Sequence, residues 1–493
     1  MGGRFAKFGA WHVAAVALIV AAIAVRFLWL GNVPGMQGDE AWYGIQARQF
    51  LAGGPVDMRT PTGNVPGFFQ TGLSILLHAV FEPGLLLLRV PPLLSALAAI
   101  VIIFACARRF LSAEADWIAA LVLAAAPIAI ANARTGWDPS HSPLFLLVTT
   151  WAFWGNRPLL GGLLFALTLT NQPATVFVAP FLLLSSVAFH DPAAGRGRFR
   201  SFLPVGVALV AVIAFAMIVS PATGEYVSLR HSLARLANPH GWWLFGQAVV
   251  DLLSGQTSYA ASSGALFDHP GMIRAVGAAA IIGIAVAGAR AYSRDSTDLR
   301  PAGILLGWLA SLAALYVIGG LWTLKPGLER FGFPMLVPTA FAIAIACHRS
   351  VYGRWIAWAL GAALLAGAWA HYLRPLHRGD GRPLRGYWVA EADPARLAFD
   401  VISRDSTLPR ETVGEDWWLT QPVAYYAVGT PIMVHDASPA LMPAPRTWLT
   451  YDGSPLDRSM SGREGFRKQW TVGTRHRSNR INVWKETPTS GSR

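Results

Sequence analysis

The amino-acid sequence predicts an α-helical polytopic membrane protein that carries a small C-terminal α/β soluble domain. Of 493 residues, 54% are hydrophobic and only 14% are charged, whereas roughly 25% of residues are charged in soluble domains. Apolar runs long enough to cross a bilayer, about 17–25 residues, recur through most of the chain. These runs stop after Tyr372. We therefore divide the chain into a membrane domain, 1–372, and a soluble domain, 373–493.

The membrane domain contains about eleven apolar segments of transmembrane length. They lie at 11–31, 89–109, 115–133, 142–156, 158–172, 174–190, 201–220, 273–291, 302–322, 333–348 and 355–372. The segment 67–88 is also apolar, but polar residues and prolines interrupt it, among them Gln70, His78 and Pro83. We therefore expect the helices of this first outer loop to lie in the membrane interface.

Basic residues indicate how the chain crosses the membrane. In this span count the basic loops fall on one side, and they contain Arg4, Lys7, Arg108, Arg109, Arg157, Arg196, Arg198, Arg200, Arg290, Arg294, Arg349 and Arg354. The positive-inside rule places that side in the cytoplasm. We expect a multi-pass inner (plasma) membrane protein with a cytoplasmic N-terminus and an extracytoplasmic C-terminal domain.

The C-terminal segment has the pattern of a small α/β domain. Short runs typical of strands occur at 430–436, 446–452 and 480–486, and a helical stretch occurs at 393–404. Strands and helices that alternate in this way, without long apolar runs, predict a soluble fold with a sheet.

Several kinds of partner are not expected from the composition. The 40 Lys and Arg exceed the 27 Asp and Glu by 13, but in a membrane protein this excess reflects loops and anionic lipid, so nucleic acid is not an expected partner. Cys106 and Cys347 lack metal-ligand spacing, and the histidines form no zinc motif. No nucleotide-binding glycine loop is present. We expect no required cofactor and no protein metal ligands, and the sequence leaves a divalent cation open.

The first candidate site is the acidic pair Asp39 and Glu40 in GDEAWYG, 38–44. The pair lies about ten residues past the first apolar run, and a helix rises 1.5 Å per residue, so it is expected at the membrane surface. One interpretation is a general base that takes a proton from an acceptor hydroxyl. The other is a helix N-terminus, with Asp39 as the cap and Glu40 favouring the dipole.

The residues that follow the pair predict an amphipathic helix over 39–51. Tyr43, Ala47, Phe50 and Leu51 share one stripe at helical spacing. Such a helix is expected to lie along the membrane with the two carboxylates at its N-terminus. Tyr43 is the residue of this stripe that we expect to contact substrate.

The second candidate site is ARTGWDPSHSP, 133–143, in the next outer loop. Asp138 supplies another carboxylate, and Trp137 supplies a flat ring that can stack on a sugar. Arg134 supplies a cation that could assist in holding the phosphate of a lipid donor. The alternative is an aromatic residue at headgroup depth beside a proline turn and a helix cap.

The third candidate site is TLKPGLERFGFP, 323–334. Lys325 and Arg330 could bind a lipid phosphate and stabilise it as it leaves. The alternative is cations that extend to the interface from helix ends. The three loops together supply carboxylates, an aromatic ring and cations at one membrane face. This joint occurrence favours a functional site over the structural interpretation given for each loop separately.

These motifs resemble the GT-C glycosyltransferases that use polyprenyl-phosphate sugars. More narrowly, the chain is similar to the protein O-mannosyltransferase-like branch, family 39, which is related to the lipid A aminoarabinose transferases. The resemblance covers most of 1–345 and depends on GDEAWYGIQARQFLAGG (38–54), LRVPPLLSALAAIVIIFACARRF (88–110), ARTGWDPSHSPL (133–144) and ERFGFPMLVP (329–338). Where the aminoarabinose transferases have a Lys-Pro-Pro stretch, this chain has NVPGFF (64–69).

The resemblance implies an inverting transfer at the outer membrane face, from a lipid phosphate sugar to an extracytoplasmic glycan, lipid or protein. It places the base or acceptor-orienting group on Asp39 and a phosphate contact on Arg330. Two other classes stay open from the residues: a transporter or flippase of lipid-linked glycans, and a non-catalytic membrane scaffold. Transporters usually carry ionisable residues at mid-membrane, whereas the charges here gather at the faces.

Overall fold

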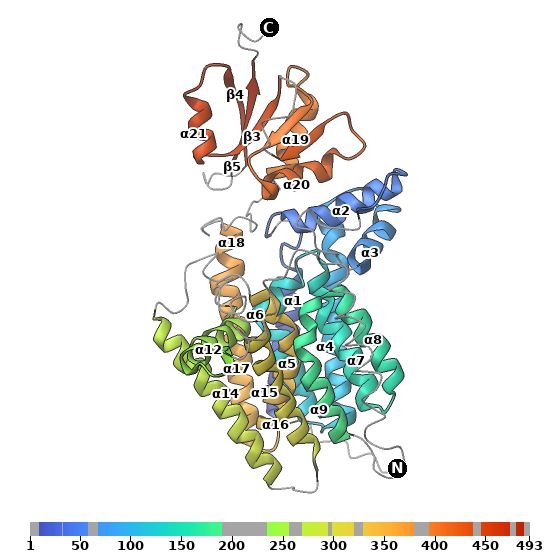
Figure 1. Cartoon of the computed structure of the whole chain (residues 1–493), viewed down its shortest axis with the longest axis vertical. Helices are drawn as coiled ribbons and strands as arrows, with labels where there is room; N and C mark the ends of the chain where they lie inside the picture. The colour runs from blue at the N-terminus through green and yellow to red at the C-terminus, as the bar shows by residue number, and fades with distance from the viewer. Residues whose placement is uncertain are drawn as a thin grey trace.

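A bundle of helices forms the larger part of the molecule, and a five-stranded sheet with its own helices lies at one end of it (Figure 1). The computed structural model describes residues 9–31, 33–57, 68–189, 234–255, 269–293, 298–319, 329–378, 394–436, 445–473 and 480–487.

The bundle consists of helices joined by short 3₁₀ segments. The helices are α1 (Ala10–Phe27), α4 (Leu85–Phe110), α5 (Ala115–Ala125), α6 (Pro127–Asn132), α7 (Ser142–Trp154), α8 (Pro158–Asn171), α9 (Ala179–Phe189), α12 (Pro239–Ser254), α14 (Pro270–Ser293), α15 (Arg300–Gly319), α16 (Leu336–Cys347) and α17 (Val351–Gly367). The 3₁₀ segments are η1 (Asp138–His141), η2 (Pro173–Val178) and η6 (Glu329–Met335). Helix α17 continues through a π-helical turn, η7 (Ala368–Leu373), into α18 (Arg374–Arg378).

Helices occur at every predicted span except 201–220, which lies outside the described residues. In the described part of the chain, five helices are long and apolar enough to cross a membrane: Ala10–Phe27, Leu85–Phe110, Pro270–Ser293, Arg300–Ile318 and Val351–Arg378. Shorter apolar helices accompany them. The mostly helical membrane architecture is therefore present, and the number of eleven spans stays a prediction.

Helix α5 lies inside the bundle and contacts α1, α4, α16 and α17. It is rich in alanine, and nearly all of its side chains are buried. A Cβ at Gly361 of α17 would lie only 2.8 Å from Cγ of Leu121. Small residues therefore allow these helices to approach closely, which is the usual basis of helix packing in membranes.

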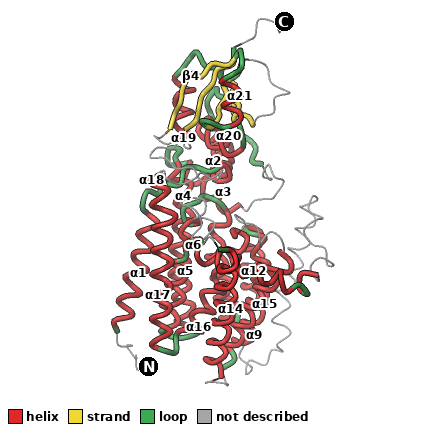
Figure 2. Tube along the Cα trace, turned by 90° about the vertical axis from the view of Figure 1, so that its left-hand side faces the viewer, coloured by secondary structure: helices red, strands yellow, loops and turns green. Residues whose placement is uncertain are grey.

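Two further helices, α2 (Gly38–Leu51) and α3 (Phe68–His78), lie between the bundle and the sheet (Figures 1 and 2). The predicted helix over 39–51 is thus present. The predicted interfacial segment 67–88 is divided instead: α3 ends at His78, and α4 begins at Leu85, just after Pro83 and Gly84. Proline and glycine end helices, and so the apolar residues after Gly84 join the long helix α4.

The C-terminal α/β unit, which we define as residues 394–487, contains one mixed sheet. Its elements are α19 (Pro394–Arg404), β1 (Glu411–Gly414), α20 (Trp417–Ala427), β2 (Met433–Asp436), β3 (Thr447–Tyr451), α21 (Pro455–Ser461), β4 (Phe466–Gly473) and β5 (Arg480–Glu486). The strand order is β2-β1-β3-β5-β4. Strand β1 pairs in parallel with β2 and β3, whereas β5 pairs antiparallel with β3 and β4. The helix and three strands predicted for this segment are all present.

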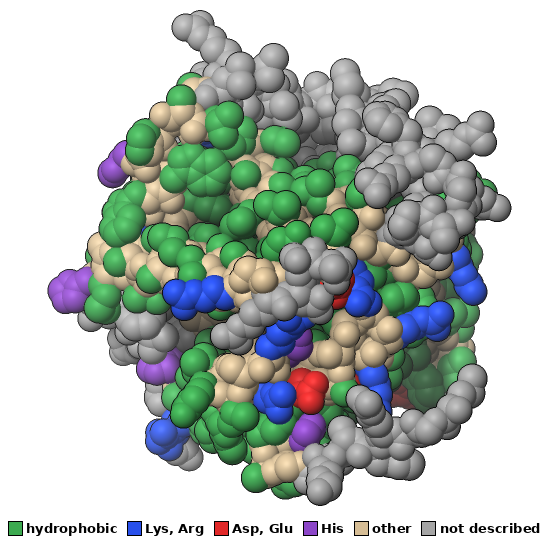
Figure 3. Space-filling model, turned by 90° about the horizontal axis from the view of Figure 1, so that it is seen from below, with side chains coloured by type: hydrophobic (Ala, Val, Ile, Leu, Met, Phe, Trp, Pro, Cys, Tyr) green, Lys and Arg blue, Asp and Glu red, His purple; other side chains and the backbone are tan. Residues whose placement is uncertain are grey.

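The opposite end of the bundle carries basic side chains among apolar ones (Figure 3). Arg349 donates to the carbonyl oxygen of Ala291, and Arg300 donates to that of Phe110. Arg354 lies 3.7 Å from Glu114. These contacts bring the ends of α4, α14, α15 and α17 together at the end remote from α2. The charge pattern agrees with the predicted separation of a basic face from the face of Asp39.

Candidate functional site

The N-terminus of α2 holds the acidic pair. The helix begins at Gly38, so Asp39 and Glu40 lie in its first turn, where negative charge is favourable beside the free backbone N–H groups. The two side chains have different surroundings. Asp39 is half-buried, and Glu40 is completely buried.

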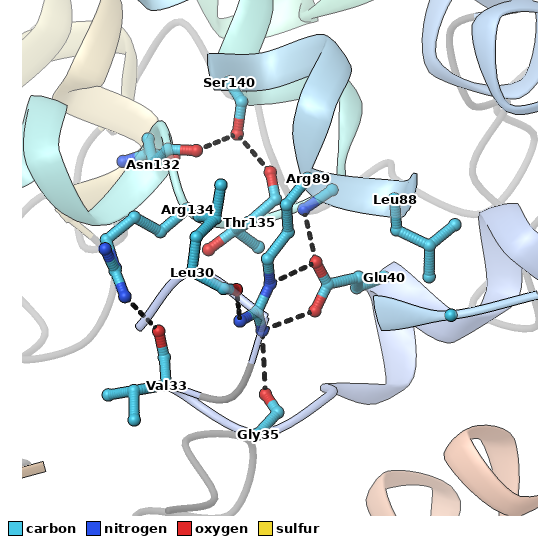
Figure 4. Close-up of polar contacts among 12 residues, drawn as sticks. Leu30, Val33, Gly35, Glu40, Leu88, Arg89, Asn132, Arg134, Thr135 and Ser140 are labelled. Atoms are coloured by element: carbon cyan, nitrogen blue, oxygen red, sulfur yellow. Dashed lines mark hydrogen bonds and ion pairs between the residues drawn. The ribbon is translucent and has the colours of Figure 1, made fainter. Parts of the chain in front are cut away.

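Glu40 forms a two-point ion pair with Arg89 of α4 (Figure 4). Nε of Arg89 lies 2.9 Å from one carboxylate oxygen, and a terminal nitrogen lies 3.0 Å from the other. The guanidinium also donates to the carbonyl oxygens of Leu30 and Gly35. The backbone N–H of Gly136 donates to Glu40 at 2.8 Å. Three segments distant in sequence are thereby fixed around one carboxylate.

This geometry gives Glu40 a different role from the one predicted beside Asp39. A carboxylate that is fully buried and holds two guanidinium donors and a backbone N–H has its oxygens occupied. In this arrangement it positions the first turn of α2, and its two oxygens face Arg89 and Gly136. Of the acidic pair, Asp39 therefore stays the candidate base.

Asp138 is brought to α2 by Tyr43. The Tyr43 hydroxyl donates to one Asp138 oxygen at 2.8 Å, and the backbone N–H of Gln70 donates to the other at 3.1 Å. Burial, and then the negative charge of Asp138, raises the pKa of Tyr43 well above its ordinary value, and Asp39 adds to the effect. The phenol therefore stays protonated. Asp138 is thus hydrogen-bonded to a tyrosine that lies one turn along α2 from Asp39.

His141 is hydrogen-bonded to Gln70, the residue whose backbone N–H donates to Asp138. Its Nε2 lies 2.9 Å from the side-chain oxygen of Gln70, an acceptor, so Nε2 carries the proton. Its Nδ1 then accepts from the Ser95 hydroxyl at 2.7 Å. The Gln70 amide nitrogen donates to the carbonyl oxygen of Leu88 at 2.9 Å. A neutral histidine thus fixes the residue whose backbone holds Asp138.

Burial lowers the pKa of His141 to about 3, and this predicts a pH dependence of stability. An unfolded histidine takes up its proton near pH ~6.5, well before the folded one. The free energy of unfolding should therefore fall as the pH falls from about 6.5 towards 3. Above about pH 6.5 the histidine is neutral in both states, so it causes no loss of stability there. We expect His141→Asn to flatten the decrease in thermal unfolding temperature of the detergent-solubilised protein between pH 7.5 and pH 5.

The matched control for that experiment is His240→Asn, because His240 is exposed on α12. It should leave the slope of unfolding temperature against pH at the wild-type value. An unchanged slope in His141→Asn would show that a buried neutral imidazole does not contribute.

Aromatic rings surround this site. Trp42, Tyr43 and Trp137 are buried against one another, and Trp417 of the C-terminal unit packs on them. The indole N–H of Trp137 donates to the side chain of Asn132 at 3.1 Å. The structure therefore places Trp137 beside Tyr43 with its ring packed on protein rings, and its contact with a sugar stays a prediction.

Arg134 lies next to the site, and its terminal nitrogens donate to backbone carbonyl oxygens; Figure 4 shows the bond to Val33. The side chain is completely buried, and its guanidinium donates to the carbonyl oxygens of Val25, Arg26 and Val33. Carbonyls at the end of α1 attract a cation, as at any helix C-terminus. In this arrangement Arg134 fixes the end of α1, which differs from the phosphate contact predicted for it.

The other predicted phosphate contacts are less fully described. Lys325 lies outside the described residues, and for Arg330 the structure describes the backbone alone, within η6. Segment η6 contacts α6 and α12. Both residues stay predictions as phosphate contacts.

Sequence reasoning missed three residues of the site: Arg89, Gln70 and His141. Arg89 opens an apolar run that is otherwise free of charge until Arg108, and a lone cation in such a position is a usable signal for a buried ion pair. Gln70 and His141 offer no comparable signal, because each acts through a partner distant in sequence. Within the described ranges, no group of three or more His, Cys, Asp and Glu side chains could hold a metal ion.

No known protein family and no curated protein matches this sequence. Solved structures do match. ArnT from Cupriavidus metallidurans in the apo state is 15% identical, with 97% of this chain and 98% of that chain covered and a TM-score of 0.42. The oligosaccharyltransferase AglB from Archaeoglobus fulgidus, in complex with an inhibitory peptide and a dolichol-phosphate, is 12% identical, with 88% and 65% covered and a TM-score of 0.50. The arabinofuranosyltransferase AftD from Mycobacteria is 15% identical, with 98% and 42% covered and a TM-score of 0.43.

One of these structures, AglB, is similar enough to define the class of fold. All three are GT-C glycosyltransferases. The likeness to AglB extends over 88% of this chain, and it shows that the chain has the GT-C fold of a membrane protein. The resemblance seen in the sequence is confirmed at that level.

Proposed function

We propose that this protein is an integral-membrane inverting glycosyltransferase that moves a sugar from a polyprenyl-phosphate donor to an extracytoplasmic acceptor. One observation carries the proposal: Tyr43 of α2 donates to Asp138, so that Asp138 lies beside the helix whose first turn holds Asp39, at one end of a GT-C bundle. A pair of carboxylates held in this way can orient a nucleophile and accept its proton.

The donor is proposed from the chemistry of the fold and of the third loop. AglB, which shares this fold, was solved in complex with a dolichol-phosphate, and this supports a lipid phosphate as donor for the present chain. Lys325 and Arg330 are the cations we propose for the phosphate, since guanidinium and ammonium groups stabilise phosphate oxygens. The glycan, lipid or protein acceptor carries a hydroxyl or an amine.

In the proposed reaction, Asp39 orients the acceptor hydroxyl and takes its proton. The acceptor oxygen bonds to the anomeric carbon as the bond from that carbon to the phosphate oxygen breaks, and the polyprenyl phosphate leaves with the electron pair. Attack from the opposite face inverts the anomeric centre. Negative charge grows on the phosphate, so fixed cations favour the transition state over the ground state. We propose that this chemistry requires no cofactor, and a divalent cation stays open.

The location of the charges supports surface chemistry over transport. In the described part of the bundle, the buried ionisable residues of the helices lie at or next to a helix end: His12, Arg26, Arg89, Asp116 and Asp251. Transporters and flippases place such groups near mid-membrane. We propose an inner-membrane protein whose N-terminus is cytoplasmic and whose α2 and C-terminal unit face outward.

The proposal is tested in the source organism. A deletion strain is compared with its parent for the composition of glycolipids, glycans and glycoproteins of the envelope. We expect the loss of one defined sugar, restored by the wild-type gene and not by Asp39→Asn. An unchanged envelope in all three fractions would overturn the proposed function.

A further inference from the structure

Helix α2 has a second face, and the C-terminal unit covers it. Residues Gly38, Ala41, Gly44 and Arg48 recur at three- and four-residue spacing, so they lie on one side of the helix. Helix α20 packs along this side. Both views of the chain show α20 next to α2 (Figures 1 and 2). The sequence motif around the acidic pair therefore contains residues for two different contacts.

The two glycines are where the aromatic rings of α20 meet the backbone of α2. A Cβ at Gly38 would lie 2.6 Å from Nε1 of Trp417. A Cβ at Gly44 would lie 2.5 Å from a ring carbon of Tyr425. Such distances leave no room for a side chain. The close approach of α20 therefore requires glycine at both positions. A residue with a side chain in place of either glycine would prevent this approach.

Polar contacts fix the other end of this interface. Arg48 donates to the carbonyl oxygens of Tyr425 and Val428 at the C-terminus of α20, where a cation is favourable. The Tyr425 hydroxyl lies 2.8 Å from Nε2 of His78 on α3. His78 directs its other ring nitrogen to the carbonyl oxygen of Ser74 at 2.7 Å, so Nε2 is the acceptor.

Helix α2 depends on such contacts, because it is weak by itself. It has 14 residues, of which Gly38 and Gly44 are two. Isolated helices of about 12–15 residues are marginal in water, and an interior glycine costs about 1 kcal/mol relative to alanine. The bundle holds one side of α2 through Glu40 and Tyr43. The other side is held by α20.

We propose that the C-terminal α/β unit is a positioning element of the site: α20 holds α2 from the outer side and so fixes Asp39 at its N-terminus. The statement about Asp39 depends on the proposed function, whereas the statement about α2 does not. In this account Trp417, Tyr425 and Arg48 are positioning residues, and the reacting groups do not include them.

The test is a single methyl group, Gly44→Ala. In a helix without this interface the change should stabilise α2, because alanine favours helix by about 1 kcal/mol. Here the added Cβ would lie 2.5 Å from the Tyr425 ring, closer than to its next neighbour, Cδ2 of Leu88 at 3.0 Å. We expect faster hydrogen exchange in residues 38–51 and a kcat that falls by about 10–100-fold, with the KM for the donor little changed.

Two further variants separate this effect from general damage. Gly72→Ala on α3 is the matched control, since a Cβ there has no atom within 4 Å, and it should leave exchange and turnover unchanged. Tyr425→Leu removes the ring edge that the methyl meets. In the Tyr425→Leu background, Gly44→Ala should add little to either measurement.

Wild-type exchange in the 38–51 segment of Gly44→Ala would overturn the inference, and so would faster exchange with wild-type turnover. An equal loss in the Tyr425→Leu background would also overturn it, because the loss would not arise at the interface. If the wild-type protein turns over no polyprenyl-phosphate sugar, the proposed function fails, and hydrogen exchange still decides whether α20 holds α2.

Discussion

Asp39→Asn is expected to lower sugar transfer by about 10²–10⁴-fold, the usual contribution of a general base. The amide keeps the size and most of the hydrogen bonds of the carboxylate, but it cannot accept the proton of the acceptor. Asp39 is only half-buried, so the fold should tolerate the change. The measurement is the rate of label transfer from a polyprenyl-phosphate sugar by the purified variant, with folding checked by its thermal unfolding temperature.

The control for Asp39→Asn is Asp57→Asn. Asp57 belongs to the same outer segment and is exposed, so its loss should leave the transfer rate at the wild-type value. Normal turnover by Asp39→Asn would remove Asp39 from the mechanism. The carboxylate of Asp138 would then be the remaining candidate base.

Glu40→Gln is expected to destabilise the folded protein by about 3–5 kcal/mol, the cost of removing one partner from a buried ion pair. Arg89 and Glu40 are both completely buried. In the variant the positive charge of Arg89 would have no anionic partner, and water could not solvate it in its place. With the amide oxygen facing Gly136, the NH₂ group of glutamine would face a terminal nitrogen of Arg89, a donor opposite a donor. The expected readout is a large fall in the thermal unfolding temperature of the solubilised protein.

Glu82→Gln provides the comparison for that substitution, because Glu82 is exposed between α3 and α4. It should change the unfolding temperature little, as surface substitutions usually do. Equal shifts for the two variants would contradict the view that Glu40 and Arg89 hold the end of α1, the start of α2 and the loop before Asp138 together.

Local patterns were sufficient for the elements and for the general place of the site. Alternation predicted the strands at β2, β3 and β5, and the acidic pair predicted the start of α2. Asp39, Tyr43, Trp137 and Asp138 could be proposed together because each carries chemistry at the same face. These predictions depend on residues near one another in the chain, and periodicity and composition describe such relations well.

Partners distant in sequence could not be predicted. The stripe of Tyr43, Ala47, Phe50 and Leu51 predicted a helix that lies along the membrane with one apolar face, but residues 40–47 are buried on every side of α2. The reason is α20, which lies some 370 residues further along the chain and covers the other face. Likewise, the sequence offers Arg134 as a free cation, and only the fold places three carbonyl oxygens around it.

The central claim is tested most directly with purified protein in proteoliposomes that contain labelled polyprenyl-phosphate sugars, with an envelope fraction of the source organism as acceptor. The account predicts that label leaves the lipid and appears in the acceptor, that free polyprenyl phosphate accumulates, and that Asp39→Asn prevents both. A lipid-linked sugar that stays intact and merely changes leaflet would contradict the account and indicate a flippase.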